Sequence, residues 1–161
     1  MGYESTLVLI KPDAIQRGLI GAVISRIEQL RLEITGAKVV RVNRALAEEH
    51  YKALRGQPFF ENLLEHLQGK LHGISYVLAF VLSGPDAISR VRQLAGATHP
   101  EKANPLTIRG SLGRMSTSGI MENVLHASSD REEAQREISL WFKPQELLSA
   151  AVSIRHASKS N

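Results

Sequence analysis

The sequence contains no cysteine and no apolar run long enough for a targeting or membrane segment. The absence of cysteine from the 161 residues excludes a disulfide scaffold, a catalytic thiol and a cysteine-bound metal. Near the N-terminus, the apolar run Thr6–Ile10 is stopped by Lys11-Pro12-Asp13, so it is too short for a signal peptide or a membrane span. We therefore expect a cytoplasmic protein with no membrane partner.

Several standard nucleotide and metal motifs are also missing. The chain has no Walker loop ending in Gly-Lys-Ser/Thr, no Gly-x-Gly-x-x-Gly after its first apolar run and no His-Glu-x-x-His. The absence of the Walker loop excludes a P-loop enzyme. The six histidines show no ligand-like spacing, and we therefore expect no metal held by protein side chains.

Aromatic residues make up only 5% of the sequence, which weakens any role as a base-stacking nucleic-acid binder. The formal charge of +4 and the pI near 9.6 nevertheless favour anionic partners, either nucleotides or, as a secondary partner, nucleic acid. With 43% hydrophobic and 22% charged residues, the chain has the profile of one globular domain. We expect this domain to span residues 1–148, followed by a small, polar C-terminal tail at 149–161.

Short apolar runs alternate with helical patterns along the chain. The first run, Tyr3–Ile10, is apolar almost throughout, as in a strand that is buried on both faces. Apolar residues then recur at helical spacing, and the next run contains Gly36, a candidate β-bulge. We expect strands at 3–10, 34–42, 74–82 and 123–126, and helices at 19–30, 46–54, 58–69, 86–95 and after residue 129. This order predicts an α+β fold, a ferredoxin-like βαββαβ sandwich whose four-stranded antiparallel sheet has helices on one face.

One histidine stands where the last strand meets the last helix. Ser129 and Glu132 have the spacing of a capping box, so a helix should begin just after His126. Other phosphate-compatible side chains also lie at element ends or in the irregular segment 96–119, and we expect them to line one cleft. They are Lys11, Arg92, Thr98 and Arg109. His126 is the candidate phosphate-carrying nucleophile, because the unperturbed pKa of a histidine side chain, about 6.5, leaves the neutral ring well populated near neutral pH. The alternative from these residues alone is a hydrogen-bonded structural histidine at a strand end.

Blocks of residues along nearly the whole chain resemble the nucleoside diphosphate kinase family. The matching blocks run in order from about Thr6 to Leu147, which makes the resemblance highly specific. They are Ile10-Lys11-Pro12-Asp13, Gln16-Arg17-Gly18-Leu19, His50-Tyr51, Pro58-Phe59-Phe60, Gly96-Ala97-Thr98-His99-Pro100, Thr107-Ile108-Arg109-Gly110, Asn123-Val124-Leu125-His126 and Glu137-Ile138-Ser139-Leu140-Trp141-Phe142. The resemblance implies transfer of a γ-phosphoryl group from a nucleoside triphosphate to a nucleoside diphosphate, by a ping-pong route through phosphohistidine at His126.

The resemblance also implies roles for individual residues. Glu137 would hydrogen-bond the histidine and fix its orientation. Lys11, Tyr51 and Asn123 would surround the phosphoryl group and the sugar hydroxyl, while the other phosphates would be held by Arg92, Thr98 and Arg109. The base would lie on Phe59 and Leu63, with Ile120 as a further contact. Mg²⁺ is expected to arrive with the nucleotide, and the assembly to be a homo-oligomer, either a hexamer or a tetramer.

The sequence departs from the family pattern close to the candidate histidine. Ser111 stands where most members have an aspartate, and segment 112–122 is longer than usual. His126-Ala-Ser-Ser-Asp replaces the common His-Gly-Ser-Asp. Two alternatives stay open: a weakly active or regulatory family member, and a basic ferredoxin-like protein that binds nucleic acid, which the pI favours and the few aromatic residues disfavour.

Overall fold

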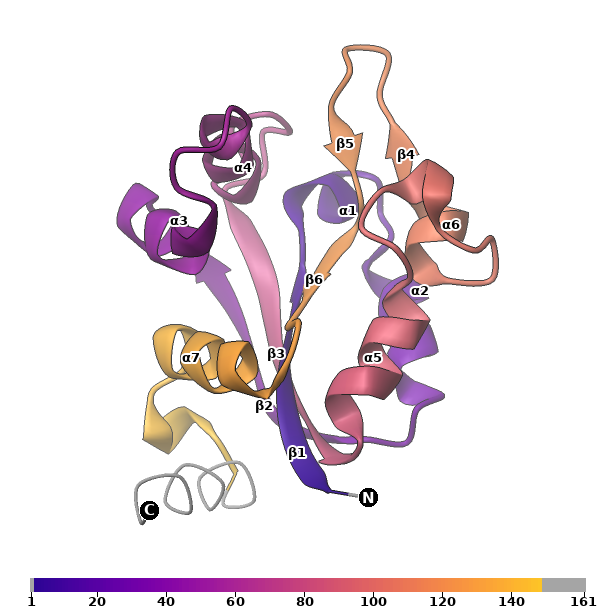
Figure 1. The fold of residues 1–161 in the computed structure, drawn as a ribbon, viewed down its shortest axis with the longest axis vertical. Helices are drawn as coiled ribbons and strands as arrows, with labels where there is room; N and C mark the ends of the chain where they lie inside the picture. The colour runs from indigo at the N-terminus through magenta and orange to yellow at the C-terminus, as the bar shows by residue number, and fades with distance from the viewer. Residues whose placement is uncertain (1, 149–161) are drawn as a thin grey trace.

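A four-stranded antiparallel sheet forms the centre of the molecule. The computed structural model describes residues 2–148, so the predicted tail at 149–161 lies outside the described residues. The strands β1 (Tyr3–Ile10), β2 (Glu33–Arg41), β3 (Tyr76–Pro85) and β6 (Leu125–Ala127) lie in the order β2-β3-β1-β6 (Figure 1). Every neighbouring pair is antiparallel. This arrangement confirms the predicted α+β, ferredoxin-like fold.

The central strand β1 separates two apolar cores. Side chains alternate between the faces of a strand, so Leu7 and Leu9 belong to one core and Val8 and Ile10 to the other. All four are fully buried. The prediction that this strand is buried on both faces is therefore confirmed.

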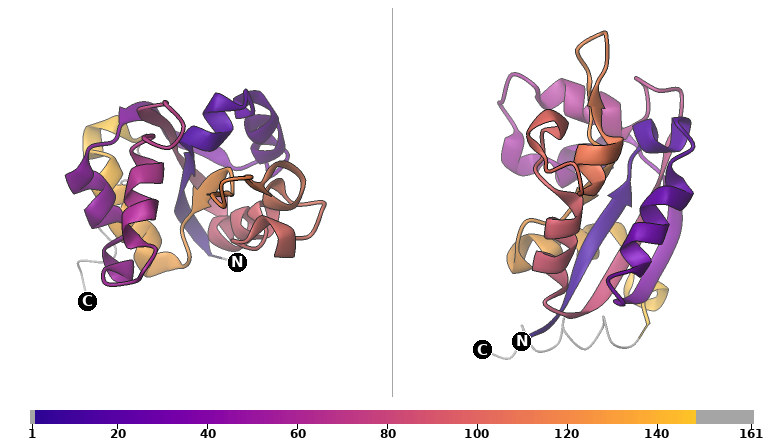
Figure 2. Two further views of the ribbon diagram at one scale, coloured as in Figure 1. Left: turned by 90° about the horizontal axis from the view of Figure 1, so that it is seen from above. Right: turned by 90° about the vertical axis from the view of Figure 1, so that its right-hand side faces the viewer.

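Helices cover both faces of the sheet, so the prediction of helices on one face is too narrow. The two crossover helices α2 (Ile20–Glu28) and α5 (Ala87–Ala95) lie on one face, together with the short α1 (Pro12–Gln16) and α6 (Ile108–Leu112). The opposite face is covered by α3 (Arg44–His50), α4 (Phe60–Leu67) and α7 (Arg131–Trp141) (Figure 2). The apolar residues of β1 require this second layer, because a bare sheet face would leave Leu7 and Leu9 in water.

Two local predictions have different outcomes. The β-bulge is confirmed, because the pairing of β2 with β3 shifts register between Ile34 and Gly36. The capping box is wrong by one residue: Asp130, rather than Ser129, caps α7 by accepting a hydrogen bond from the backbone N–H of Glu133 at 2.9 Å. Ser129 instead donates to the Asp130 carboxylate, at 2.7 Å.

The segment between α5 and β6 has more structure than its sequence indicates. It contains the 3₁₀ turn η2 (Pro100–Lys102), α6, and the two short strands β4 (Arg114–Met115) and β5 (Met121–Glu122), which pair with each other. The β4–β5 hairpin projects from the body of the molecule (Figures 1 and 2). Further 3₁₀ turns lie at η1 (Lys52–Leu54) and η3 (Pro144–Glu146). Among residues 2–148, no helix combines the length and apolarity needed to cross a membrane.

Candidate active site

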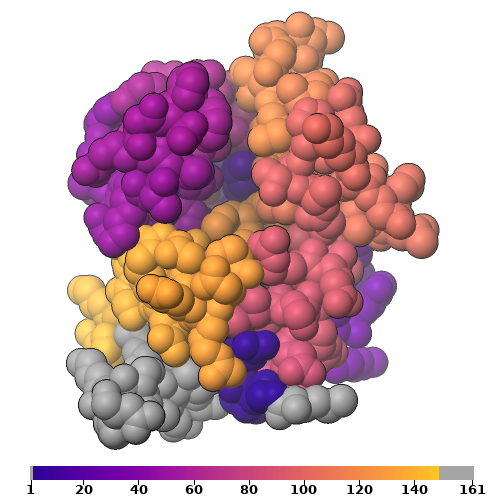
Figure 3. All heavy atoms as spheres, viewed as in Figure 1, coloured from indigo at the N-terminus to yellow at the C-terminus, as the bar shows by residue number. Residues whose placement is uncertain are grey.

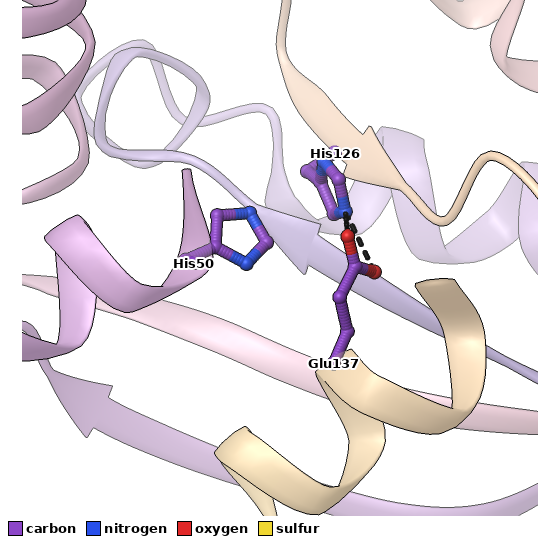
Figure 4. A group of neighbouring side chains, drawn as sticks. All are labelled: His50, His126 and Glu137. Carbon is purple, nitrogen blue, oxygen red and sulfur yellow. Dashed lines mark hydrogen bonds and ion pairs between the residues drawn. The ribbon is translucent and has the colours of Figure 1, made fainter. Parts of the chain in front are cut away.

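His126 lies on β6 and points toward α7. Its Nε2 atom is 2.9 and 3.0 Å from the two carboxylate oxygens of Glu137 (Figure 4). The Glu137 side chain is 4% exposed and that of His126 is 20% exposed, so the ring is held on one side and reachable on the other. A carboxylate can only accept hydrogen bonds, and Nε2 therefore carries the proton. The neutral ring then has its free electron pair on Nδ1.

Ser128 holds the carboxylate that orients the histidine. Its hydroxyl donates to Glu137 Oε2 at 2.6 Å and accepts from the backbone N–H of Leu7 at 3.1 Å. Ser128 directly follows β6 and is two residues from His126, so both side chains reach Glu137 on α7. The carboxylate is thus held from the C-terminal end of the strand that carries the histidine.

A second histidine, His50, packs edge-on against His126 with ring centroids 4.5 Å apart. It lies at the end of α3 and is buried. The indole N–H of Trp141 donates to its Nδ1 at 3.2 Å. Burial lowers the pKa of His50 well below its ordinary value, and the neighbouring His126, Arg136 and Lys11 act in the same direction. His50 is therefore neutral, with its proton on Nε2.

His50, His126 and Glu137 are the kinds of ligand that bind Zn²⁺, and their ligand atoms lie within 4.8 Å of one another. Their hydrogen bonding opposes that use. Trp141 occupies the accepting nitrogen of His50, and the proton on the other nitrogen leaves no free electron pair for a metal. We therefore assign the group to hydrogen bonding, and the expectation of no protein-held metal stays an expectation.

Lys11, Asn123 and Thr98 form a second group of predicted residues that the structure brings together. The Lys11 ammonium donates to Asn123 Oδ1 at 2.7 Å, and Asn123 Nδ2 donates to the Thr98 carbonyl at 3.1 Å. Lys11 is buried between β1 and α1. Burial lowers the pKa of Lys11 to about 8, although the charge of Asp13 opposes the shift.

Arg109 lies beside the histidine strand. Its guanidinium donates to the carbonyls of Gly96 at 2.8 Å and Leu125 at 2.9 Å, while its buried Nε has no hydrogen-bond partner among residues 2–148. Burial, together with the nearby charge of Arg92, lowers the pKa of Arg109 to about 10. The structure therefore places two predicted cations close to each other and one of them against β6.

Tyr51 follows His50 and contacts its ring, with centroids 4.6 Å apart. Burial raises the pKa of the Tyr51 hydroxyl, and the charge of Glu137 raises it further while Arg109 opposes it. Tyr51 therefore senses the charges of both Glu137 and Arg109. Its hydroxyl stays protonated and can donate to a substrate oxygen.

The predicted base-contacting residues lie on two separate elements, α4 and the β4–β5 hairpin. Phe59 directly precedes α4 and is 47% exposed, and Leu63 lies one turn further along that helix. Ile120 lies in the β4–β5 hairpin, where its N–H bonds Ser116. No hydrogen bond or ring contact in the described part of the chain joins these three residues to His126. The space-filling view shows a hollow between the lobe of α3 and α4 and the lobe of α6 and the hairpin (Figure 3).

Sequence reasoning missed His50 and Ser128 as site residues. Ser128 could have been found, because it is two residues from His126 in an extended segment and thus on the same face. Trp141 follows Glu137 by four residues and shares its helix face. The packing of His50 on His126 joins residues 76 positions apart, and no local pattern indicates it.

Comparison with known proteins gives one consistent result. A family model described as nucleoside diphosphate kinase matches residues 4–147. A nucleoside diphosphate kinase of Pyrococcus furiosus is 47% identical over 144 residues, which cover 89% of this chain and 86% of that protein.

Solved structures share the fold. A structure of the Borrelia burgdorferi nucleoside diphosphate kinase, solved as a transition-state mimic with bound vanadate and ADP, has a TM-score of 0.82 at 37% identity. The match covers 91% of each chain. The Halobacterium salinarum enzyme in complex with CDP has a TM-score of 0.82 at 39% identity, covering 92% of this chain and 93% of that one. The chain therefore belongs to the nucleoside diphosphate kinase family, a family of phosphotransferases.

Proposed function

We propose that this phosphotransferase carries the phosphoryl group on Nδ1 of His126. In the first half-reaction, Nδ1 attacks the γ-phosphorus of a nucleoside triphosphate, the bond to the β,γ-bridging oxygen breaks and the diphosphate leaves. In the second, a terminal phosphate oxygen of another nucleoside diphosphate attacks the phosphorus and the N–P bond breaks. The observation that carries this proposal is the pair of contacts between Nε2 and Glu137, because they keep the proton off Nδ1.

The charge that develops during transfer needs several donors. Lys11, Asn123 and Tyr51 surround the transferring phosphoryl group in this proposal, while Arg92, Thr98 and Arg109 hold the remaining phosphates. The unpartnered Nε of Arg109 supports its role, because a buried donor without a partner is costly until a ligand oxygen supplies one. The complex of the Borrelia burgdorferi relative with vanadate and ADP shows that a member of the family binds these groups.

The base is proposed to stack on Phe59 and Leu63, with Ile120 approaching from the hairpin. Phe59 exposes about half of its surface, as a stacking platform requires. Stacking is available to every base, so this contact favours broad nucleotide specificity.

Mg²⁺ is proposed to arrive bound to the phosphates. Asp13 and Glu137, two buried carboxylates of the proposed site, each accept at least two hydrogen bonds from protein groups. The residues present therefore fit a metal held by the nucleotide and water rather than by the protein. When bound, the ion neutralises phosphate charge.

A homo-oligomer is proposed to form through the edge strand β2. This strand pairs only with β3 in the described sheet, and its Ile34 and Val39 are 43% and 66% exposed. An exposed apolar edge strand promotes pairing with another chain. The choice between hexamer and tetramer, the cytoplasmic location and the domain boundary at residue 148 stay predictions.

The test of the proposed function is incubation with γ-labelled ATP, followed by acid and base treatment of the protein. We expect acid-labile, base-stable label that moves to an added nucleoside diphosphate and is absent from the variant His126→Ala. Label that persists in this variant excludes His126 as the carrier. If the wild type folds but takes up no label, the result favours the regulatory alternative. A titration with nucleic acid across salt concentrations tests the other alternative, a basic protein that binds nucleic acid.

A further inference from the structure

The backbone that leads into the histidine strand makes an unusual turn at Val124. Its φ angle is +74°, and the N–H of Leu125 donates to the carbonyl of Asn123 at 2.8 Å, which closes a γ-turn. A β-branched residue rarely adopts this conformation, and its surroundings must hold it there at a cost of about 1–3 kcal/mol. The turn lies between the proposed phosphate ligand Asn123 and the nucleophile His126.

One short segment of the chain holds both polar groups of Val124. Its carbonyl accepts from the backbone N–H of Lys11, and its N–H donates to Asp13 Oδ2, both at 2.9 Å. The same Lys11 donates through its side chain to Asn123. The position of the turn therefore sets how Lys11 and Asn123 face the transferring group.

Asp13 is fully buried and depends on a histidine from another helix. Its second oxygen, Oδ1, lies 2.8 Å from Nε2 of His66 on α4. Burial alone would raise the pKa of Asp13, but the hydrogen bond from His66 and the charge of Lys11 lower it to about 2. The aspartate is thus ionised, and His66 donates to it.

The contacts continue from His66 back to the turn. The rings of His66 and His72 have centroids 4.8 Å apart, and Nε2 of His72 lies 3.1 Å from Oε1 of Glu122. Arg114 binds the other oxygen of Glu122 at 2.5 Å. Since Glu122 directly precedes Asn123, the contacts form a closed ring around the turn. We call Asp13, His66, His72 and Glu122 the turn clamp.

We propose that His66 and His72 are positioning residues for phosphoryl transfer. They act through the turn clamp, which keeps the Asn123–Leu125 turn in place so that Lys11 and Asn123 meet the transition state. Glu122 belongs to the segment that departs from the family pattern, so the clamp joins the atypical hairpin to the catalytic strand. This inference rests on the roles of Lys11, Asn123 and His126 proposed above.

The test compares two substitutions of His66 that differ in one hydrogen-bond donor. His66→Phe keeps a ring but loses the donor, whereas His66→Gln keeps a donor. Small misplacements of catalytic groups slow reactions by up to about 100-fold, so we expect His66→Phe to phosphorylate His126 about 10- to 100-fold more slowly. We expect KM for ATP to change less than this rate, and His66→Gln to recover most of the loss.

A matched control separates positioning from stability. Val23→Ala removes buried apolar contacts on α2, outside the turn clamp, and its effect on Tm serves as the reference. The proposal is overturned if His66→Phe and Val23→Ala phosphorylate His126 at equal rates at similar Tm. It is also overturned if His66→Gln loses as much of this rate as His66→Phe does. If His66→Phe does not fold, Glu122→Gln and His72→Phe provide the comparison: we expect each to slow the transfer, and normal rates in both overturn the proposal. Failure of the wild type to label His126 would instead contradict the proposed function.

Discussion

Replacing Glu137 by glutamine tests whether the carboxylate controls which nitrogen of His126 is free to take the phosphoryl group, as proposed above. The carboxylate accepts from Nε2 of His126 at 2.9 and 3.0 Å and from the Ser128 hydroxyl at 2.6 Å. An amide offers one accepting oxygen and one donating nitrogen. If the donating nitrogen faces Nε2, the proton of the ring must move to Nδ1, and the nucleophilic electron pair is lost.

The expected size of the effect follows from these contacts. Hydrogen bonds to charged groups contribute about 1.5–3 kcal/mol, against about 0.5–1.5 kcal/mol for neutral ones, so the substitution weakens the contact by about 1–2 kcal/mol. Each 1.36 kcal/mol changes a rate tenfold, and loss of the correct tautomer adds to the barrier. We expect phosphorylation of His126 to slow by about 10- to 100-fold while labelling still occurs.

The assay is rapid quench of the first half-reaction with γ-labelled ATP, measured at saturating nucleotide. Ser128→Ala is the matched control, because it removes one hydrogen bond from Glu137 and keeps the charge. We expect this control to slow the reaction less than Glu137→Gln does, because the carboxylate still accepts the proton of Nε2. An unchanged rate in Glu137→Gln would refute the orienting role, and a larger loss in Ser128→Ala would move that role to the serine.

Three further predictions concern other residues of the site. Because the pKa of Lys11 is lowered to about 8, we expect kcat/KM to fall above that pH as the free enzyme loses this proton, and Lys11→Arg to remove the fall in a pH profile. Phe59→Ala should raise KM by a similar factor, about 5- to 50-fold, for purine and pyrimidine nucleotides in steady-state assays. Trp141 is the only tryptophan and bonds His50, so its fluorescence should change when His126 is phosphorylated, and not in His126→Ala.

Elements that depend on local pattern were predictable from the sequence. The apolar run of β1, the periodicity of α2 and the bulge at Gly36 all have short-range causes. The short helix α1 is not predicted from the sequence, because Pro12 ends the apolar run of β1 and also suits the first turn of a helix. The second helical layer followed in principle from the continuous burial of β1.

The candidate site was predictable in its composition and not in its contacts. The family resemblance placed His126, Glu137, Lys11 and Asn123, and the structure joins them in two pairs. The contacts of His50 with His126 and of Asp13 with Val124 link distant segments, and only the folded chain brings these together. The sequence also does not decide which residue caps α7, because Ser129 and Asp130 are both favourable N-cap residues.

The tip of the β4–β5 hairpin has a consequence for how this enzyme can diversify. Its backbone closes on itself, since Ser116 N–H donates to the Ile120 carbonyl and Gly119 N–H donates to the Ser116 carbonyl, both at 2.9 Å. The base of the hairpin is fixed separately by Arg114 and Glu122. Residues 117 and 118 can therefore be exchanged or fused to a reporter peptide, whereas Gly119 is retained because its φ angle is +79° and its N–H closes the tip.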